Sequence, residues 1–138
     1  MKIKYDLMLM KQMALFEKIS KVRPKDAFED DNGVLHFIVN KGFIIKAIGK
    51  KGITAKKISE ALKKRIKIIE FDNVRETFIK RLLFPLKVSE IESENNIVKI
   101  KAIDNETRGK IIGRNGSNLR NYEKIVKRFF EIDEIKVM

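Results

Sequence analysis

The fold is decided by a short stretch that the chain carries twice: Ala47-Ile48-Gly49-Lys50-Lys51-Gly52 and Ile111-Ile112-Gly113-Arg114-Asn115-Gly116. The second copy begins 64 positions after the first, counted from Gly49 to Gly113. In both, Ile precedes the first glycine, a basic residue follows it, and an apolar stripe at helical spacing comes next. These stripes are Ala55, Ile58, Ala61 and Leu62 in the first copy, and Leu119, Tyr122, Ile125, Val126 and Phe129 in the second. The sequence therefore predicts a duplicated unit in which each G-x-x-G turn opens a helix.

Composition points to a basic protein that binds an anionic polymer. The 138 residues carry a net charge of +12 with a pI near 9.9, and residues 1–71 hold +9 of that charge against +3 in residues 72–138. Such an excess favours a nucleic acid as partner, although a Lys-rich genome or thermal adaptation would also produce it. The chain has no Cys, no signal-peptide core and no apolar run of transmembrane length, so we expect a cytoplasmic protein that does not enter a membrane.

The first unit is predicted to span residues 1–71. Helical periodicity runs from Tyr5 to Ser20 and Pro24 stops it. The Asn32-Gly33 pair between two apolar runs predicts a β-hairpin. We expect strands at 27–29 and 34–39, a short helix at 43–48, a helix from 53 to about 64, and a strand at 66–71.

The second unit, residues 72–138, repeats this order. Asp72-Asn73 with Glu76 predicts a capping box at the start of a helix, Pro85 ends that helix and begins a strand, and Asp104 caps the next helix. We expect further elements at 98–103, 105–112, 117–130 and 132–137. Both units then read helix, strand, strand, helix, G-x-x-G, helix, strand, an α/β (α+β) fold. Because no flexible linker separates Phe71 from Asp72, the sequence predicts two rigidly joined units.

Several conspicuous residues have ordinary structural explanations. Met8, Met10 and Met13 are predicted to fill the core, with a partner-binding patch as the less common alternative. Asp30 and Asp31 suit a turn, and His36 has no second ligand residue nearby, so it is expected to be an ordinary strand residue. We therefore expect no metal and no cofactor.

The Ile-Gly-x-x-Gly motif between two helices resembles the KH RNA-binding family. The helix and hairpin precede the motif, and the chain ends on the strand that follows the last helix, as in type II KH domains of bacteria and archaea. Two such units in tandem are similar to the small archaeal form of the NusA family of transcription factors. The resemblance covers nearly the whole chain and implies single-stranded RNA as partner, with a role in transcription elongation or termination.

The resemblance agrees with what the residues allow. Glycines without Cβ permit close approach of a sugar-phosphate backbone, and the following helix offers unpaired N–H groups and the positive end of its dipole. In KH domains the loop clamps about four nucleotides beside an apolar groove. Ile58 and Tyr122 are further candidates for that groove, and some of the apolar candidates are expected to belong to the core instead. The predicted RNA-binding residues are Ile48, Gly49, Lys50, Lys51, Gly52, Ile53, Ala55 and Lys56 in the first unit, and Ile112, Gly113, Arg114, Asn115, Gly116, Ser117, Leu119 and Arg120 in the second.

Two departures from the family pattern shape the expectation. Arg114-Asn115 replaces two lysines, and Asp104 and Glu106 lie just before the second loop, so its grip on phosphate is predicted to be weaker. Larger NusA proteins also carry an N-terminal polymerase-binding domain and a further RNA-binding barrel, which are not expected here. This departure argues against direct binding to RNA polymerase, which stays an open candidate as a partner.

Other classes fit less well. A DNA-binding helix-turn-helix would place Ile53–Lys64 as recognition helix, but the preceding hairpin and the less basic second copy argue against it. The sequence has neither nucleotide-binding glycine motif, and no carboxylate pair lies beside a His, Ser or Cys in a recognisable catalytic arrangement. We therefore predict a monomeric, non-enzymatic RNA-binding protein. The main alternative is a KH protein acting on ribosomal RNA or as an RNA-processing adaptor.

Overall fold

A computed structural model of the chain describes residues 6–138 and divides them into two compact units, with the boundary in the sequence between Asp72 and Asn73. We refer to them as unit 1 and unit 2. Tyr5, the predicted start of the first helix, lies outside the described residues. Within the described part of the chain, no helix is both long and apolar enough to span a membrane. The rigid joining of the units stays a prediction.

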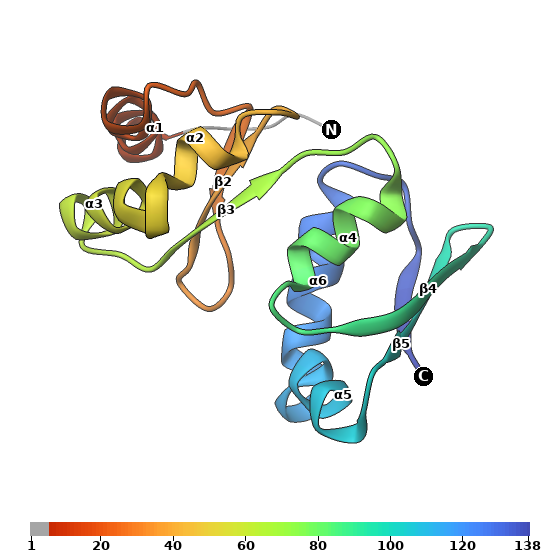
Figure 1. The fold of residues 1–138 in the computed structure, drawn as a ribbon. Helices are drawn as coiled ribbons and strands as arrows, with labels where there is room; N and C mark the ends of the chain where they lie inside the picture. Colours follow the sequence, from red (N-terminus) through yellow and green to blue (C-terminus); the bar gives the residue numbers. More distant parts are fainter. Residues whose placement is uncertain (1–5) are drawn as a thin grey trace. The chain divides into compact units, whose positions relative to one another are not determined.

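Unit 1 is a three-stranded sheet with helices packed on one face (Figure 1). Strands β1 and β2 form an antiparallel hairpin, whereas β2 and β3 run parallel and therefore need a crossover connection, which α2 and α3 supply. Its elements are α1 (Leu7–Ser20), β1 (Asp26–Glu29), β2 (Leu35–Val39), α2 (Ile44–Ile48), a single 3₁₀ turn η1 (Lys50–Gly52), α3 (Ile53–Leu62) and β3 (Ile66–Glu70).

The core of unit 1 lies between the helices and alternate residues of β2. Leu35, Phe37 and Val39 are fully buried, and the ring of Phe37 stacks on Phe16 of α1 with centroids 4.3 Å apart. Ile58 of α3 belongs to the same cluster and has no exposed surface. The sheet thereby fixes α3, and with it the G-x-x-G turn that precedes the helix.

Helix α1 buries a narrower face than its sequence predicts. Met8 and Met10 are 67% and 57% exposed, and only Met13 packs against the core cluster. The prediction that all three methionines fill the core is therefore wrong for two of them. The helix contacts the rest of unit 1 through the Phe16 side, and Met8 and Met10 lie early in the helix, off that side.

The hairpin turn holds a buried polar pair. The carboxylate of Asp30 accepts hydrogen bonds from the N–H groups of Asn32 and Val34, which is the predicted turn chemistry, and lies 2.7 Å from His36 Nε2. Burial lowers the pKa of His36, outweighing the Asp30 bond, which raises it. His36 is therefore neutral at pH 7 and donates its Nε2–H to Asp30.

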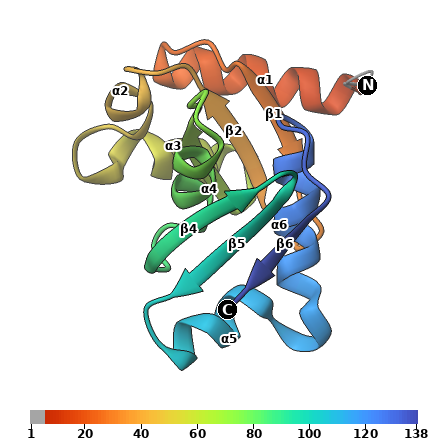
Figure 2. The same ribbon diagram turned by 90° about the vertical axis from the view of Figure 1, so that its right-hand side faces the viewer.

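Unit 2 repeats the architecture of unit 1, and its three strands lie side by side in Figure 2. Strands β4 and β5 are antiparallel and β5 and β6 are parallel, with Val98, Ile100 and Ile135 buried toward the helices. Its elements are α4 (Arg75–Leu83), β4 (Val88–Glu94), β5 (Ile97–Ala102), α5 (Asn105–Ile112), a 3₁₀ turn η2 (Arg114–Gly116), α6 (Ser117–Lys127) and β6 (Glu134–Val137). The predicted order of elements is thus confirmed in both units.

Three local predictions for unit 2 are wrong. Helix α4 starts at Arg75 with Val74 as an N-cap that makes no side-chain bond, and the Glu76 carboxylate accepts a hydrogen bond from Ser93 instead of closing a capping box. Pro85 lies in the turn before β4, which begins at Val88. Helix α6 ends at Lys127, three residues before the predicted end at 130. The predicted Asp104 cap is confirmed, since its carboxylate accepts the Thr107 N–H at 2.7 Å.

Candidate nucleic-acid interface

The two G-x-x-G turns have nearly the same backbone conformation. Gly49 and Gly113 have φ/ψ of 80°/168° and 72°/178°, and Gly52 and Gly116 have 76°/13° and 74°/13°. Between them, Lys51 and Asn115 both adopt the left-handed region at 55°/25° and 54°/28°. Two segments of different sequence therefore present the same backbone surface, and any difference between the sites must come from side chains.

The first glycine of each turn is required by packing inside the unit. A Cβ built on Gly49 would lie 2.3 Å from Thr54 Oγ1 and 2.9 Å from the Thr54 backbone nitrogen. At Gly113 the same atom would lie 2.6 Å from Asn118 Cγ. The bare side of this glycine therefore faces the next helix, a packing role that the sequence pattern did not predict, and its contact with RNA stays a prediction.

The second glycine is the one with a bare side that meets no protein atom, and this holds only in unit 1. No heavy atom lies within 4 Å of a Cβ built on Gly52, whereas at Gly116 Nη1 of Arg120 would lie 3.1 Å away. Arg120 also donates from Nη2 to the Asn115 carbonyl at 2.7 Å. The Gly52 backbone is therefore open to an incoming strand, while the guanidinium of Arg120 covers the equivalent face of Gly116.

The helices that follow both turns begin without a side-chain cap. Gly52 and Gly116 are the N-caps of α3 and α6 and offer no side-chain acceptor. Within the loops, the N–H groups of Gly52 and Ile53 already bond to the carbonyls of Gly49 and Lys50. The attraction for an anion therefore comes from the remaining first-turn N–H groups and the helix dipole, and is smaller than a fully unpaired loop would give.

Loop 1, Gly49–Gly52, is surrounded by free positive charge. Lys50, Lys51 and Lys56 are exposed, as are Lys46 and Lys57 on the adjoining helices. Within residues 6–138, none of the five makes an ion pair within 4.0 Å. Their charge is thus available to phosphate groups that lie along the loop.

Loop 2, Gly113–Gly116, has less free charge. Lys110, the counterpart of Lys46, lies 3.4 Å from Glu106 one turn earlier on α5. Asp104 is occupied in capping that helix, and the backbone hydrogen bond from Thr107 lowers the pKa of its carboxyl, so it stays ionised. Arg114 is exposed, but Arg120 is folded onto the loop.

The apolar residues predicted for the groove divide into three groups. Ile53 is 54% exposed, at the first position of α3. Ile58 is fully buried in the core of unit 1, so its assignment to the groove is wrong. The half-buried group comprises Ile48, Ala55, Ile112, Leu119 and Tyr122, while Ser117 is exposed.

Sequence reasoning missed two exposed apolar residues before loop 1. Phe43 is 47% and Ile45 is 83% exposed, whereas the sequence pattern assigns them only to the short helix at 43–48. Thr107 and Gly109 occupy the corresponding positions 64 residues later. That contrast between the copies was visible in the sequence and is the signal that could have found them.

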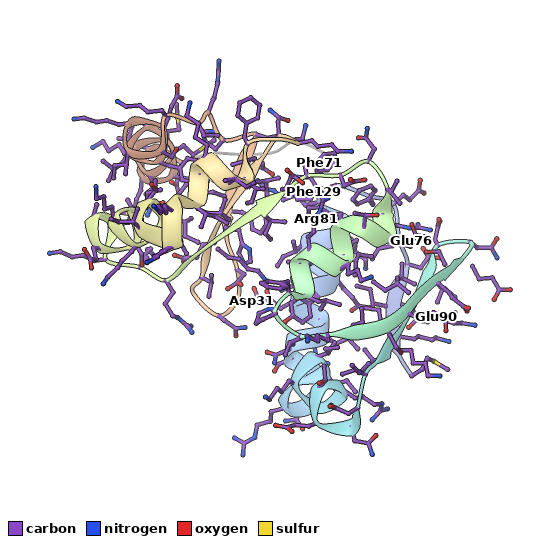
Figure 3. The ribbon with its side chains drawn as sticks, viewed as in Figure 1. Asp31, Phe71, Glu76, Arg81, Glu90 and Phe129 are labelled. Carbon is purple, nitrogen blue, oxygen red and sulfur yellow. The ribbon has the colours of Figure 1, made fainter. Side chains whose placement is uncertain are left out.

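A separate hollow in unit 2 does not suit an anion. It lies between α4 and β4 and is lined by Glu76, Thr77, Lys80, Val88, Glu90 and Ile91, and Glu76 and Glu90 are labelled in Figure 3. The hydrogen bond from Ser93 lowers the pKa of Glu76, which keeps that carboxylate charged. The described residues also contain no group of His, Cys, Asp or Glu side chains arranged to hold a metal ion.

Two helices joined by a G-x-x-G turn, which together connect two parallel strands of a small sheet, define a KH-type fold. Residues 75–138 match the family model described as the NusA-like second KH domain. This match covers α4 to β6, which is nearly all of unit 2.

Relatives extend the similarity to nearly the whole chain. The chain is 32% identical over 130 residues to the "Probable transcription termination protein NusA" of Halococcus morrhuae, covering 93% of each chain. It is also 32% identical to the protein of that name from Methanocaldococcus jannaschii, covering 92% of this chain and 70% of the relative. A solved crystal structure of APE1850 is similar with a TM-score of 0.74 and 25% identity, over 97% of this chain and 100% of that one. The chain belongs to the NusA family.

Proposed function

We propose that the chain binds single-stranded RNA through loop 1 and loop 2 and acts on transcription elongation or termination. Unit 1 is then a KH domain like unit 2, with the domain boundary near residues 71 and 72. The observation that carries the proposal is the open face of Gly52 among five unpaired lysines. The names of the relatives support the link to transcription termination.

In this proposal the sugar-phosphate backbone lies against Gly52, with its phosphates near Lys50 and Lys51. The bases turn toward the half-buried apolar residues beside the loop, Ile48 and Ala55, and pack on these aliphatic side chains. A duplex cannot splay its bases in this way, so single strands are preferred. A strand long enough to reach loop 2 gains affinity through effective concentration.

The function proposed is binding without catalysis, by a monomer in the cytoplasm. RNA polymerase is the protein partner to test, because a factor acting on a nascent transcript works beside the polymerase. Co-elution of the full chain with purified polymerase, with and without a nascent RNA, tests a direct contact. Size-exclusion chromatography with light scattering tests the monomer.

A titration of labelled single-stranded RNA against duplex DNA of equal length tests the binding class. We expect tighter binding to the RNA and a steep loss of affinity with salt, because phosphate contacts release counterions. A preference for the duplex would contradict the proposal and favour a helix-turn-helix role for α3.

The double substitution Lys50→Asp plus Lys51→Asp tests loop 1. Replacing two phosphate contacts by repulsive charges should weaken RNA binding about tenfold or more and lower the salt slope by about 1.4. The matched control is Lys11→Asp plus Lys63→Asp, which makes the same charge change at exposed positions of unit 1 away from the loop. Helical circular dichroism should be unchanged in both. Equal weakening by the two pairs would mean that only net charge matters.

Crosslinking in cells followed by sequencing of the attached RNA separates the proposal from its alternative. Nascent transcripts near their 3′ ends are expected for a transcription factor. Enrichment of ribosomal RNA alone would favour the ribosomal or RNA-processing alternative while leaving the binding site itself intact.

A further inference from the structure

The structure distinguishes the two loops at one position of the following helix. In unit 2 the guanidinium of Arg120 reaches back across the first turn of α6, donates to the Asn115 carbonyl at 2.7 Å and lies over Gly116. In unit 1 the corresponding residue is Lys56, and the space over Gly52 is empty to 4 Å. The two loops have nearly the same backbone conformation, so this difference comes from the side chain.

We propose that Arg120 is a specificity-determining latch that closes loop 2 and makes loop 1 the primary anchor for RNA. The inference rests on the proposed function, which treats both loops as RNA sites. An RNA backbone that approaches Gly116 must first displace the guanidinium from the Asn115 carbonyl. At loop 1 no such displacement is needed, so RNA engages loop 1 first and reaches loop 2 as a tethered second step.

The chemistry of the two side chains explains why the latch needs arginine. A guanidinium is planar and presents five donors in a fixed fork, so it can bond a carbonyl with one nitrogen while its plane covers the neighbouring glycine. A lysine ammonium is a compact, strongly hydrated charge on a flexible stem and gives up little by remaining in water. Once displaced, Arg120 keeps its charge and can pair with the phosphate that replaced it.

A charge-conserving exchange tests the latch in the full-length chain. Arg120→Lys gives loop 2 the arrangement of loop 1, and Lys56→Arg gives loop 1 the arrangement of loop 2. Each is measured with the other loop disabled: Arg120→Lys on the Lys50→Asp plus Lys51→Asp background, and Lys56→Arg on an Arg114→Asp plus Asn115→Asp background. The readouts are the Kd for a short single-stranded RNA and its salt slope.

For the latch we expect Arg120→Lys to tighten binding and Lys56→Arg to weaken it, each roughly two- to fivefold, as for one exposed charged hydrogen bond. The salt slope should not change, because no charge is added or removed. Weaker or unchanged binding with Arg120→Lys would overturn the latch and make Arg120 a plain phosphate contact or a bystander. A chain without RNA binding in any form would instead refute the proposed function, so the two failures are distinguishable.

Discussion

The division of labour between the two glycines of each loop predicts that they fail differently when substituted. Gly49→Ala places a Cβ 2.3 Å from Thr54 Oγ1, 2.8 Å from Thr54 Cβ and 2.9 Å from the Thr54 nitrogen. Rotation of the Thr54 side chain can relieve the first contact but not the other two. Gly52→Ala meets no atom within 4 Å. The clash at Gly49 can therefore be relieved only by moving the start of α3 away from the loop.

Backbone strain adds to the difference. Gly49 has φ 80° and ψ 168°, a region that is essentially restricted to glycine and costs other residues about 1–3 kcal/mol. Gly52 has φ 76° and ψ 13°, where alanine pays about 1–2 kcal/mol. With the clash included, we expect Gly49→Ala to destabilise unit 1 by about 3 kcal/mol or more and Gly52→Ala by about 1–2 kcal/mol. For a unit of this size, each 1 kcal/mol lowers Tm by roughly 4–8 °C.

Thermal and urea unfolding, followed by circular dichroism, measure both variants, and RNA titration is carried out below the lower Tm. Gly52→Ala should still fold but bind RNA more weakly, since its methyl group occupies the open face. Gly49→Ala should show the larger loss of stability. Gly113→Ala and Gly116→Ala repeat the comparison in unit 2. Equal losses of stability at Gly49 and Gly52 would refute the assignment of the first glycine to packing.

Two further predictions concern unit 1. Ile58→Ala should lower its free energy of unfolding by about 2–5 kcal/mol in urea, since it removes a fully buried side chain. Ile53→Ala should change the free energy of unfolding by no more than about 0.5 kcal/mol and weaken RNA binding, and the reverse pattern would restore Ile58 to the groove. Because burial lowers the pKa of His36, the folded state disfavours its protonation: stability is fully present above the unfolded pKa of about 6.5 and is lost as pH falls through the lower folded value. The hydrogen bonds from His36 and the backbone outweigh burial and keep the pKa of Asp30 lowered, so the stability that Asp30 contributes is fully present above pH 3.8 and is lost only below that pH. The urea midpoint of the wild type should therefore decrease when the pH is lowered from 7.5 to 5, and the decrease should be smaller in His36→Gln. Equal decreases in the two proteins would contradict this prediction.

The order of elements was predictable because its signals are local. Asp104 caps α5 through the Thr107 N–H, and the Asn32-Gly33 pair turns the hairpin, with Gly33 at a φ of 77°. Each signal depends on a few neighbouring residues whose backbone preferences hold in any fold. The repeat then assigned the same order to both halves, so weak signals in one unit were supported by stronger ones in the other.

Predictions failed where tertiary contacts decide. Periodicity marked Met8 and Met10 as apolar positions of a helix, but only the packing of Phe16 determines which side of α1 is buried. Glu76 has the spacing of a capping box, but its carboxylate accepts a hydrogen bond from Ser93, 17 residues away, instead of from the start of the helix. A sequence pattern indicates which local contacts are possible. The tertiary fold determines which of them form when residues distant in the sequence offer alternative partners.

The candidate site shows the same limit most clearly. The motif alone located both loops, and their nearly identical backbone angles explain why, since a left-handed turn between two glycines is a local property. The motif did not reveal that Gly49 and Gly113 serve the packing of Thr54 and Asn118, nor that the face of Gly116 is covered. The first glycine is fixed by contacts inside the unit, so duplication leaves it alike in both copies. The residues that can diverge without loss of fold are the exposed ones over the second glycine, and it is there, at Lys56 and Arg120, that a duplicated unit is free to become two sites of different strength.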